Sequence, residues 1–333
     1  MQEFILINQE EVASILDMKT VIAAVEKAYS LKVSGQAELF PIVCHEFSGE
    51  DSEFDIKSGS VDGAGAFGMK LVSAFYGNDV YGLPRLMGTI LVFDRKTGTL
   101  KGMMDGTLIT NMRTGAAGGV GAKYLARPGS ENLVVLGTGA QAMPLIEATL
   151  EALGNIKKIT VVNVHNQGKA GAFAEAVREK VGSGFEVCFA EDMAGLEVAV
   201  RSADVILTAT PSKEAIIKSG WVKPGTHLSC IGSDMEGKQE LDLELTGRAK
   251  LFADDVTQVV AVGECEKAVK AGLVKAEDIT EIGDVTLGNK PGRTSDEDIT
   301  IFDSTGIGLQ DLMTASMVID KAKEKGIGTL LKV

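Results

Sequence analysis

The sequence predicts an α/β protein with two domains, one of which is built on a doubly wound parallel sheet. The length of 333 residues fits about two domains of ordinary size. The apolar fraction of 45% is enough for a core in each of them. From residue 127 onward, short apolar runs alternate with segments of helical pattern, beginning with "NLVVL", "AMPLIEATLEAL", "KITVVNV" and "AGAFAEAVREKV". This alternation is typical of parallel strands with helices on both faces of the sheet.

The first part of the chain mixes helices and strands. In "NQEEVASIL", Asn8 stands as an N-cap with Glu11 three residues later, which predicts a capping box. A second helix is expected to begin after Asp17 and to end near Gly35. The segment "AFGMKLVSAFY" alternates like a strand, and "GTILVFDRKTGTLKGMMDG" predicts a hairpin. We therefore expect an α+β domain here.

The change of pattern sets the expected domain limits. We assign residues 1–126 to the α+β domain and residues 127–304 to the parallel-sheet domain. The closing stretch "GLQDLMTASMVIDKAKEKG" reads as a helix after the last strand signal. We expect residues 305–333 to return to the first domain and complete it.

Charge and cysteine content exclude several classes of protein. The net charge of −13 and the lack of a Lys/Arg run oppose binding to nucleic acid or to an anionic membrane. No stretch reaches the roughly 18 apolar residues of a membrane span, and "MQEFILINQEE" lacks the basic start of a secretion signal. The four cysteines form no C-x-x-C pair and have no histidine at ligand spacing. We expect no metal and no disulfide, but reduced buried thiols in a cytoplasmic protein.

A glycine-rich turn follows the first strand of the second domain. After "LVVL" come Gly137, Gly139 and Ala142, then a helix and a second strand, which is the context of a dinucleotide-binding fingerprint. Gly137 would allow the sharp turn, Gly139 would leave room for a pyrophosphate, and Ala142 would let the helix pack closely. The backbone amides of the turn, which also contains Thr138, Ala140 and Gln141, would face the phosphates. The alternative is a purely structural turn. We expect a Rossmann domain that binds NAD(P)(H).

The end of the second strand bears on the choice of cofactor. A carboxylate at this place would bind the ribose 2′-hydroxyl of NAD, whereas the sequence reads "VNVHNQGK" and contains none. His165, Asn166 and Lys169 would suit a 2′-phosphate, so NADP is slightly favoured over NAD. The alternative is that these are ordinary polar residues of a loop and that either cofactor is accepted.

Five segments in a fixed order identify a family resemblance: "GMKLVSAFYGNDVYGLPRLMG", "NMRTGAAGGVGAKYLARP", "LGTGAQA", "WVKPGTHLSCIGSDMEGKQELD" and "ITIFDSTGIGLQDL". Nearly the whole chain resembles the ornithine cyclodeaminase/μ-crystallin family, which includes archaeal-type alanine dehydrogenases and ketimine reductases. The resemblance implies an N-terminal substrate and dimerisation domain, a Rossmann domain and a homodimer. It also implies NAD(P)-dependent interconversion of amino acids with imines or 2-oxo acids.

This chemistry needs a clamped carboxylate, a proton carrier and an α-carbon placed against the nicotinamide. Lys70 is expected to lie opposite the apolar face of its strand, and with Arg113 it matches the family's carboxylate-binding residues. Asp234 follows an apolar strand and matches the catalytic aspartate that moves the proton. The structural alternatives are a solvated lysine, an ion-paired arginine and an N-cap, respectively.

Further site residues follow from a strand end and from the resemblance. Thr210 and Pro211 end another strand and are expected at the cofactor, with a plain tight turn as the alternative. The cofactor contacts implied by the family are Arg113, Thr114, Lys238 and Ser304, and the implied substrate contact is Thr305. His45, His165 and His227 stand near no nucleophile motif, so hydrolase chemistry is rejected.

Two departures from the cyclodeaminase pattern limit the substrate. Lys57 stands where the cyclodeaminases resembled here carry a glutamate, and it would repel the distal ammonium of ornithine. Ile42 or a neighbour occupies the place of their upstream arginine. We therefore expect an amino-acid dehydrogenase or imine reductase that acts on a small substrate bound in part by Lys57. The alternatives are an ornithine cyclodeaminase and a crystallin-like protein that binds NADPH and a ligand with little turnover.

Overall fold

A computed structural model describes residues 2–48, 51–166 and 168–332 of the chain. The chain divides into two compact units, which we call unit 1 (Met1–Arg113 with Ile307–Val333) and unit 2 (Thr114–Gly306). The C-terminal residues thus return to the N-terminal part. The first division falls inside helix α3 (Thr107–Leu125) rather than after it, because the glycine-rich second half of this helix packs within unit 2.

Unit 1 is built on a mostly antiparallel sheet with the strand order β16-β1-β7-β6-β5-β4-β2, in which β3 also pairs with β4. Only β1 and β7 pair in parallel among these neighbours of the described chain. The expected hairpin is formed by β6 and β7. The strands are β1 (Glu3–Ile7), β2 (Ala37–Leu39), β3 (Val43–Glu46), β4 (Ser52–Val61), β5 (Ala66–Phe75), β6 (Leu86–Asp94), β7 (Leu100–Asp105) and β16 (Thr329–Lys332).

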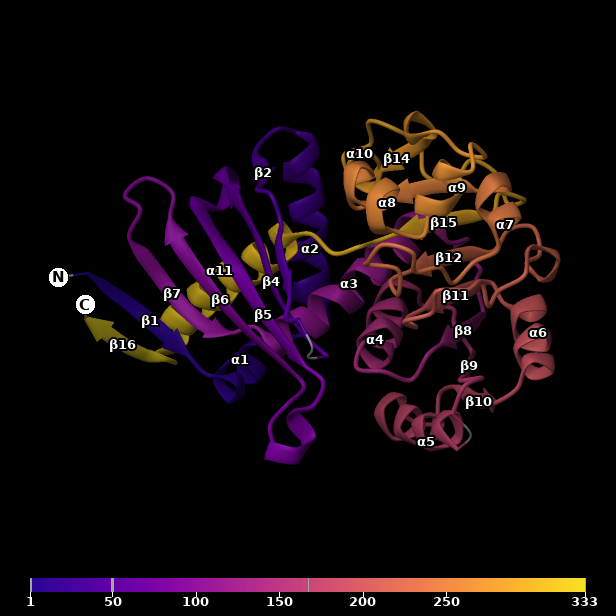
Figure 1. Cartoon of the computed structure of the whole chain (residues 1–333), viewed down its shortest axis with the longest axis horizontal. Coiled ribbons are helices and arrows are strands. Elements are labelled where there is room, and N and C mark those ends of the chain that lie inside the picture. The colour runs from indigo at the N-terminus through magenta and orange to yellow at the C-terminus, as the bar shows by residue number, and fades with distance from the viewer. Residues whose placement is uncertain (1, 49–50, 167, 333) are drawn as a thin grey trace. The chain divides into compact units, whose positions relative to one another are not determined.

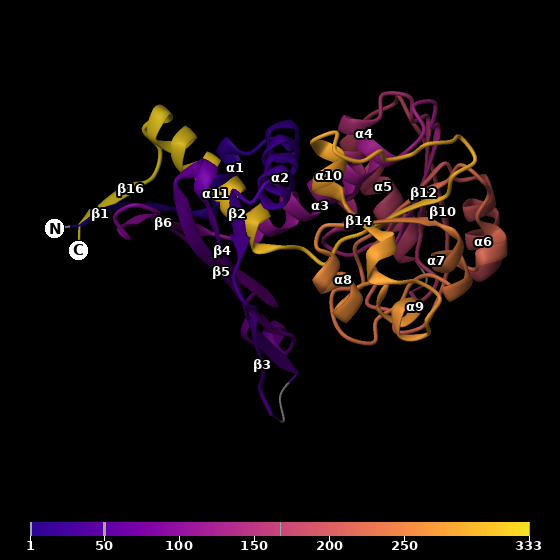
Figure 2. The ribbon, with the colours of Figure 1, turned by 90° about the horizontal axis from the view of Figure 1, so that it is seen from above.

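The helices of unit 1 are α1 (Gln9–Ile15), α2 (Met18–Val33) and α11 (Gly308–Lys325), with short 3-10 turns at Asp62–Ala64 and Asn78–Tyr81. The capping box of α1 forms as expected: Asn8 Oδ1 accepts from the Glu11 N–H, and Glu11 Oε2 accepts from the Asn8 N–H, both at 2.9 Å. Asp17 caps α2 by accepting from the N–H of Thr20. Figure 2 shows the three helices gathered on one side of the sheet.

Glycines in the strands let α11 lie directly on the sheet (Figure 1). A Cβ at Gly68 would stand 2.9 Å from Cδ2 of Leu312, and one at Gly102 would stand 2.7 Å from Cδ1 of Ile319. Both distances are shorter than a carbon contact allows. The sequence therefore reserves room in the strands for the apolar side chains of a helix that comes at the far end of the chain.

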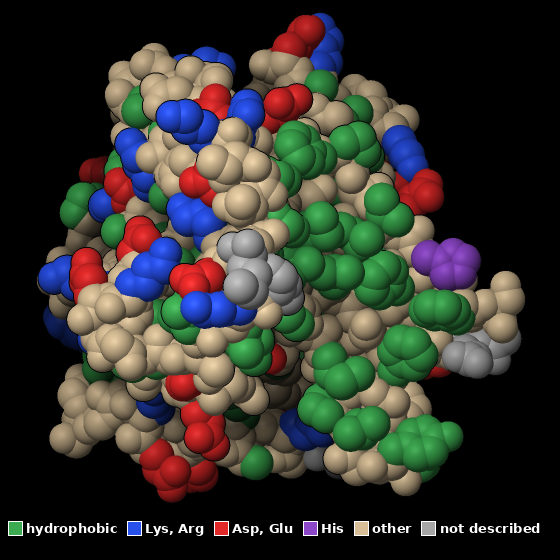
Figure 3. Space-filling model, turned by 90° about the vertical axis from the view of Figure 1, so that its left-hand side faces the viewer, with side chains coloured by type: hydrophobic (Ala, Val, Ile, Leu, Met, Phe, Trp, Pro, Cys, Tyr) green, Lys and Arg blue, Asp and Glu red, His purple; other side chains and the backbone are tan. Residues whose placement is uncertain are grey.

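The alternation expected in β5 is present. The face that carries Lys70 is the one that α11 covers, so Lys70 is only 2% exposed. Phe67, Met69 and Leu71 lie on the other face and are half-buried. Helix α11, which comes near the end of the chain, decides which face of β5 is buried. Figure 3 shows apolar side chains gathered on this side of the molecule.

Unit 2 is a parallel sheet with the strand order β10-β9-β8-β11-β12-β15-β13-β14. Each neighbouring pair runs parallel, and the order reverses between β8 and β11, so the expected Rossmann-type doubly wound sheet is confirmed. The strands are β8 (Asn132–Leu136), β9 (Lys158–Val162), β10 (Glu186–Ala190), β11 (Val205–Thr208), β12 (His227–Cys230), β13 (Lys250–Ala253), β14 (Ile279–Glu281) and β15 (Thr300–Asp303).

The core of unit 2 fills both faces of this sheet. Leu133 and Val135 belong to one apolar cluster, whereas Val134 and Leu136 belong to another. This explains why β8 reads as a continuous apolar run. The helices that cover the sheet and its edges, besides α3, are α4 (Ala142–Ala152), α5 (Lys169–Val181), α6 (Met193–Ser202), α7 (Leu243–Arg248), α8 (Val256–Val262), α9 (Glu266–Lys270) and α10 (Ile282–Thr286), with 3-10 turns at Ser219–Trp221 and Ala276–Asp278.

The cysteines differ in part from the expectation of buried thiols. Cys230 and Cys265 are buried, but Cys44 is exposed and Cys188 is half-buried. Cys44 lies on β3, whose four residues are all exposed, which the local sequence does not reveal. Within the described part of the chain, no helix is both long and apolar enough to cross a membrane.

Candidate functional site

The turn after β8 has backbone geometry that requires glycine at one position and leaves space at another. Gly137 has a φ of +111°, and a Cβ there would stand 2.6 Å from the carbonyl oxygen of Ala209. A Cβ at Gly139 would meet no described atom within 4 Å. Ala142 begins α4 and is fully buried. The turn therefore leaves space for a ligand at Gly139, whereas Gly137 and Ala142 pack tightly against the rest of the protein.

A cavity of ≈ 380 Å³ lies at this turn, where β8, β9 and β11 end. This is the carboxyl edge of the sheet at its reversal of strand order, the usual binding place in such folds. Ala140 and Gln141 follow in the same turn, ahead of α4. The expected cofactor residues that line the cavity are Gly137, Thr138, Gly139, His165, Asn166, Thr210 and Pro211.

Asn163, which was not expected in the site, organises this edge of the cavity. Its Nδ2 donates to Thr138 Oγ1 at 2.8 Å, and its Oδ1 accepts from the N–H groups of His165 and Asn166, both at 3.1 Å. It therefore joins the glycine turn to the loop after β9. The signal in the sequence was an asparagine directly after an apolar strand, a common place for a side chain that closes a turn on the backbone.

A carboxylate also contacts the loop after β9, although none follows β9 in the sequence. Glu191, which follows β10, accepts from the N–H of Gly168 at 2.8 Å. Lys169 lines the cavity beside this loop. Gly168, which follows β9, is thus contacted by a carboxylate from the end of β10.

Asp234 and Lys238 form an ion pair in the loop after β12. Lys238 Nζ lies 2.5 Å from Asp234 Oδ1, with the Asp234 side chain about half exposed and that of Lys238 mostly buried. Asp234 caps none of the helices in the described chain, so the N-cap alternative is not realised. The sequence placed these two residues in separate roles, whereas the structure joins them.

Thr210, Ser304 and Thr305 use their hydroxyl groups within unit 2. Thr210 Oγ1 donates to Glu240 at 2.7 Å. Ser304 Oγ donates to Asp254 at 2.8 Å, and Thr305 Oγ1 donates to Gln258 at 3.1 Å. Three other residues expected at the cofactor do not line the cavity at the glycine turn: Thr114, Lys238 and Ser304. Thr114 is buried in α3.

Unit 1 brings its two expected carboxylate-binding cations onto one buried aspartate. Lys70 Nζ lies 2.9 Å from Asp311 Oδ2, and Arg113 Nε lies 3.1 Å from Asp311 Oδ1. Arg113 also donates from Nη1 to Gln310 Oε1 at 3.2 Å. Strand β5, helix α3 and the first turn of α11 supply these groups. Arg113 is thus ion-paired, as its structural alternative held, whereas the solvated-lysine alternative for Lys70 is wrong.

The electrostatics of this cluster lower two pKa values for different reasons. Burial, the Arg113 charge and the Lys57 charge lower the pKa of Lys70 to about 7, against the opposing effect of Asp311. Burial alone would raise the pKa of Asp311, but the neighbouring cations Arg113, Lys70 and Lys57 hold it below its usual range. Lys70 therefore changes its charge near neutral pH, whereas Asp311 stays ionised.

Lys57 lies directly opposite Lys70 in the register of β4 and β5. Side chains at such positions share one face of the sheet. Lys57 is half-buried and acts on both Lys70 and Asp311. Gln310 and Asp311 stand in the segment "ITIFDSTGIGLQDL", but no role was expected for them, because polar residues are ordinary in the first turn of a helix.

His227, one of the three histidines considered in the sequence, is fully buried in unit 2. Its ring nitrogens each lie 3.0 Å from a hydroxyl, of Thr300 and of Ser229. Burial and the Arg293 charge lower the pKa of this imidazole to about 3, so it is neutral at pH 7. It is a satisfied core residue.

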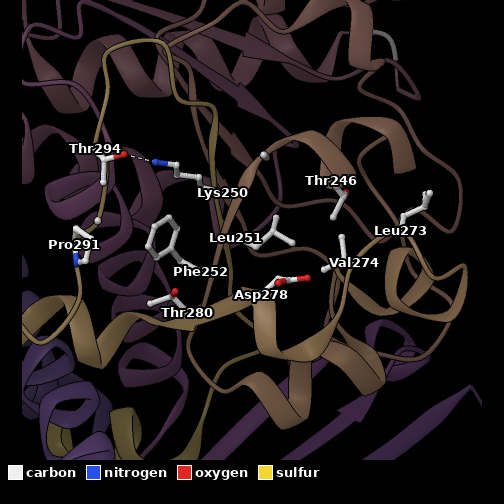
Figure 4. Close-up of a pocket in the computed structure, with 13 residues that line it drawn as sticks. Thr246, Lys250, Leu251, Phe252, Leu273, Val274, Asp278, Thr280, Pro291 and Thr294 are labelled. Atoms are coloured by element: carbon white, nitrogen blue, oxygen red, sulfur yellow. Dashed lines mark hydrogen bonds between the residues drawn. The ribbon is translucent and has the colours of Figure 1, made fainter.

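A further cavity of ≈ 360 Å³ lies beside β13 and β14, and Figure 4 shows its lining. None of the site residues expected from the sequence lines it. Lys250, whose Nζ donates to Thr294 Oγ1 in Figure 4, is also paired with Asp298 at 2.8 Å. The lysine of this cavity is therefore already paired within the protein.

Comparison with known proteins agrees with this geometry. A model of the ornithine cyclodeaminase/mu-crystallin family matches residues 2–326. The alanine dehydrogenase of Archaeoglobus fulgidus is 39% identical over 337 aligned positions, which cover 99% of this chain and 98% of that protein. A solved archaeal alanine dehydrogenase dimer with bound NAD has a TM-score of 0.91 at 37% identity and 99% coverage of both chains. The iminosuccinate reductase of Paracoccus denitrificans, in complex with NAD⁺, has a TM-score of 0.93 at 31% identity and 100% coverage of both.

These relatives are oxidoreductases named for an amino acid or an imine, and both solved structures hold a nicotinamide cofactor. The expected class of enzyme, a nicotinamide-dependent oxidoreductase of amino acids or imines, is confirmed. The match extends over both units and includes each motif from which the resemblance was inferred. The chain therefore belongs to the ornithine cyclodeaminase/mu-crystallin family.

Proposed function

We propose that the protein is an NAD(P)-dependent oxidoreductase that interconverts a small L-amino acid with its imine or 2-oxo acid. The observation that carries this proposal is the cluster of Lys70 and Arg113 on one buried carboxylate. Two buried cations sharing one anion hold a surplus of positive charge, which a substrate carboxylate would neutralise. The activities of the alanine dehydrogenase and the iminosuccinate reductase support the same reaction class.

The residues at the glycine turn fit a dinucleotide. The open position at Gly139 leaves the backbone accessible, and the N-terminus of α4 directs N–H groups toward a pyrophosphate. When bound, the nicotinamide supplies or accepts the hydride. In this proposal Thr210 and Pro211 contact the cofactor from the end of β11, and Lys238, Ser304, Thr114 and Arg113 complete its site.

The substrate carboxylate is bound by Lys70 and Arg113. Lys70 Nζ is ion-paired with Asp311 Oδ2 at 2.9 Å and carries three N–H donors that a ligand carboxylate can use. Arg113 donates from Nε to Asp311 and from Nη1 to Gln310, and no hydrogen-bond partner of its Nη2 lies in the described chain. Thr305 and Lys57 are the further substrate contacts. The two cations would orient the α-carbon for hydride transfer.

Asp234 moves the proton in this proposal. Its half-exposed carboxylate at the carboxyl edge of the sheet can take a proton from the substrate amine and return it. Lys238, 2.5 Å away, holds the carboxylate in one orientation. In the dehydrogenase direction the amine loses its proton to Asp234 as the hydride leaves Cα.

For the cofactor we propose a slight preference for NADP over NAD. His165, Asn166 and Lys169 line the rim of the cavity at the end of β9, where no carboxylate follows the strand. Glu191 is engaged by the N–H of Gly168. Kinetics with NADPH and NADH test this preference. A lower KM for NADH would overturn it without affecting the proposed reaction.

We also propose a homodimer formed through the half-exposed face of the unit 1 sheet. Phe67 stacks on Phe93 there, with ring centroids 5.1 Å apart, and Met69 lies opposite Leu91 in the register. Exposed apolar residues continue this face, among them Val43 and Met87. Large apolar patches mark interfaces, and the archaeal alanine dehydrogenase is a dimer. A second copy of the chain is the proposed occupant.

Ornithine cyclodeamination is the second candidate. Against it stands the position of Lys57 beside Lys70, since two ammonium groups would repel the distal ammonium of a diamine substrate. A crystallin-like binding protein is the third candidate, and the pairing of Lys70 and Arg113 on Asp311 argues against that role.

One set of assays tests the three candidates. The protein is incubated with NADPH or NADH, ammonium and a 2-oxo acid such as pyruvate or oxaloacetate, and absorbance is followed at the nicotinamide band. Oxidation of the cofactor supports the proposal. Release of ammonia from ornithine without net change in the cofactor would overturn it, and so would tight cofactor binding without turnover of any substrate.

A further inference from the structure

We infer that Asp311 is a positioning residue: its carboxylate holds Lys70 and Arg113 in the arrangement that receives the substrate carboxylate. This inference rests on the proposed function for its kinetic consequence. Asp311 would not touch substrate itself and would act through the two cations. It stands in the segment "ITIFDSTGIGLQDL", from which no role for it was expected.

The geometry commits each carboxylate oxygen to a different cation. Asp311 Oδ2 lies 2.9 Å from Lys70 Nζ, and Asp311 Oδ1 lies 3.1 Å from Arg113 Nε. Asp311 is fully buried, so water does not screen either contact. One rigid anion therefore fixes the spacing of two flexible cationic side chains.

The backbone that carries Asp311 is itself anchored. The neighbouring Gln310 accepts from Arg113 Nη1 and from the N–H of Ile307 at the start of α11, at 3.2 and 3.0 Å. Its Nε2 donates to the hydroxyl of Tyr29 on α2 at 2.6 Å. The first turn of α11 is thus tied to α2 and α3, which limits the freedom of Asp311.

Charge explains why an anion is needed at this place. The charged groups that act on Lys70 are Lys57 from β4, Arg113 from α3 and Asp311 from α11, while β6 presents the apolar Ile90 opposite it. Of these groups, only Asp311 favours the protonated lysine. Without it, burial and two cations would leave Lys70 neutral at pH 7 and unable to pair with a carboxylate.

The test replaces Asp311 by Asn, which keeps its shape and removes its charge. We expect the KM for the 2-oxo acid to rise by about tenfold or more, since the partners of a buried charge pair depend strongly on each other. The alkaline limb of kcat/KM should move to lower pH by about one unit or more, the usual effect of losing an adjacent opposite charge. The Kd of NADPH or NADH should stay unchanged, because the glycine turn is untouched.

Three further variants make the test specific. Asp320→Asn, at an exposed position of the same helix, should behave as the parent protein. Asp311→Glu keeps the charge and should restore most of the pH limb. In a double-mutant cycle, Asp311→Asn should add little to the loss caused by Lys70→Met, since the aspartate is expected to act largely through that lysine.

A measurement without turnover separates this inference from the proposed function. The side-chain nitrogen of Lys70 is followed by NMR in ¹⁵N-lysine-labelled protein and assigned by its loss in Lys70→Met. Titration near pH 7 in the parent and at lower pH in Asp311→Asn supports the inference even if no substrate is turned over. An unchanged titration, or equal loss of kcat and cofactor affinity in Asp311→Asn, would overturn it. If Asp311→Asn fails to fold, Asp311→Glu decides the matter: a Lys70 that titrates as in the parent supports the inference, and a lowered pKa despite the retained charge overturns it.

Discussion

Lys57 and Lys70 lie directly opposite each other on the antiparallel strands β4 and β5, on one face of the sheet. Like charges at such positions destabilise a sheet, and the charge of Lys57 contributes to the lowered pKa of Lys70. A bound anion would relieve this repulsion. The pair therefore stabilises the fold less than neutral residues would, and its arrangement favours a site for a negatively charged ligand.

The pH dependence of substrate binding follows from the pKa of Lys70. This pKa is lowered from 10.5 to about 7, so the ammonium form prevails below pH 7 and is lost above it. Since only the ammonium form pairs with a carboxylate, the affinity for a 2-oxo acid should be highest below pH 7 and fall as the pH rises. Inhibition by oxamate, measured from pH 6 to 9 at fixed cofactor, checks this. An affinity that is constant across that range would contradict it.

Replacing Lys57 by Met should move that fall to higher pH. The substitution removes a like charge beside Lys70, so the pKa of Lys70 rises and its ammonium form persists further. Lys32→Met, at the C-terminal end of α2, is the matched control and should leave the profile in place. A shift of the Lys57→Met profile to lower pH would show that Lys57 acts in another way.

Asp234→Asn should lower kcat by about 10²-fold or more, the usual contribution of a positioned acid or base. The amide cannot accept and return the proton, but it keeps the size of the side chain and its contact with Lys238. Cofactor binding, followed by the fluorescence of NADPH or NADH, should therefore remain. Asp296→Asn, at an exposed position of unit 2, serves as the control. Normal turnover by Asp234→Asn would remove the proton-transfer role.

The two glycines of the turn should respond in different ways. Gly139→Val should lower cofactor affinity by about tenfold or more with little change in melting temperature, because its side chain would enter space that is free of protein. Gly137→Ala should lower stability by more than about 1 kcal/mol, because its φ is +111° and its Cβ would clash with Ala209. Thermal unfolding and cofactor titration separate the two effects. Equal behaviour of the variants would contradict this reading of the turn.

Features that depend on neighbours in sequence could be predicted. The capping box of Asn8 and Glu11 needs residues three apart, and the turn at Gly137 needs only a strand before it and a helix after it. Both are formed by local backbone chemistry. The doubly wound sheet followed from a repeated alternation of apolar runs, which is also read locally.

Features that depend on distant packing could not be predicted. The burial of Lys70 is caused by α11, which comes near the end of the chain, so the alternation in β5 could not show which face is covered. The role of Asp311 also depends on distant packing, since an aspartate in the first turn of a helix is ordinary until its cationic partners are known. The spacing of four residues between Asp234 and Lys238 is compatible with an ion pair. The loop conformation that brings the two side chains together could not be predicted.

The half-exposed face of the unit 1 sheet is expected to form the interface of a homodimer. If a second copy covers it, the protein in solution should have twice the 35.0 kDa mass of one chain. Leu91→Arg places a charge among Met69, Phe67 and Phe93 on that face, and its desolvation should oppose association. Val198→Arg, at an exposed apolar position of unit 2, should leave the mass unchanged. Light scattering after size exclusion measures both variants. A dimer that survives Leu91→Arg would place the interface elsewhere, because an unpaired guanidinium cannot be buried in an apolar contact without a large loss of affinity.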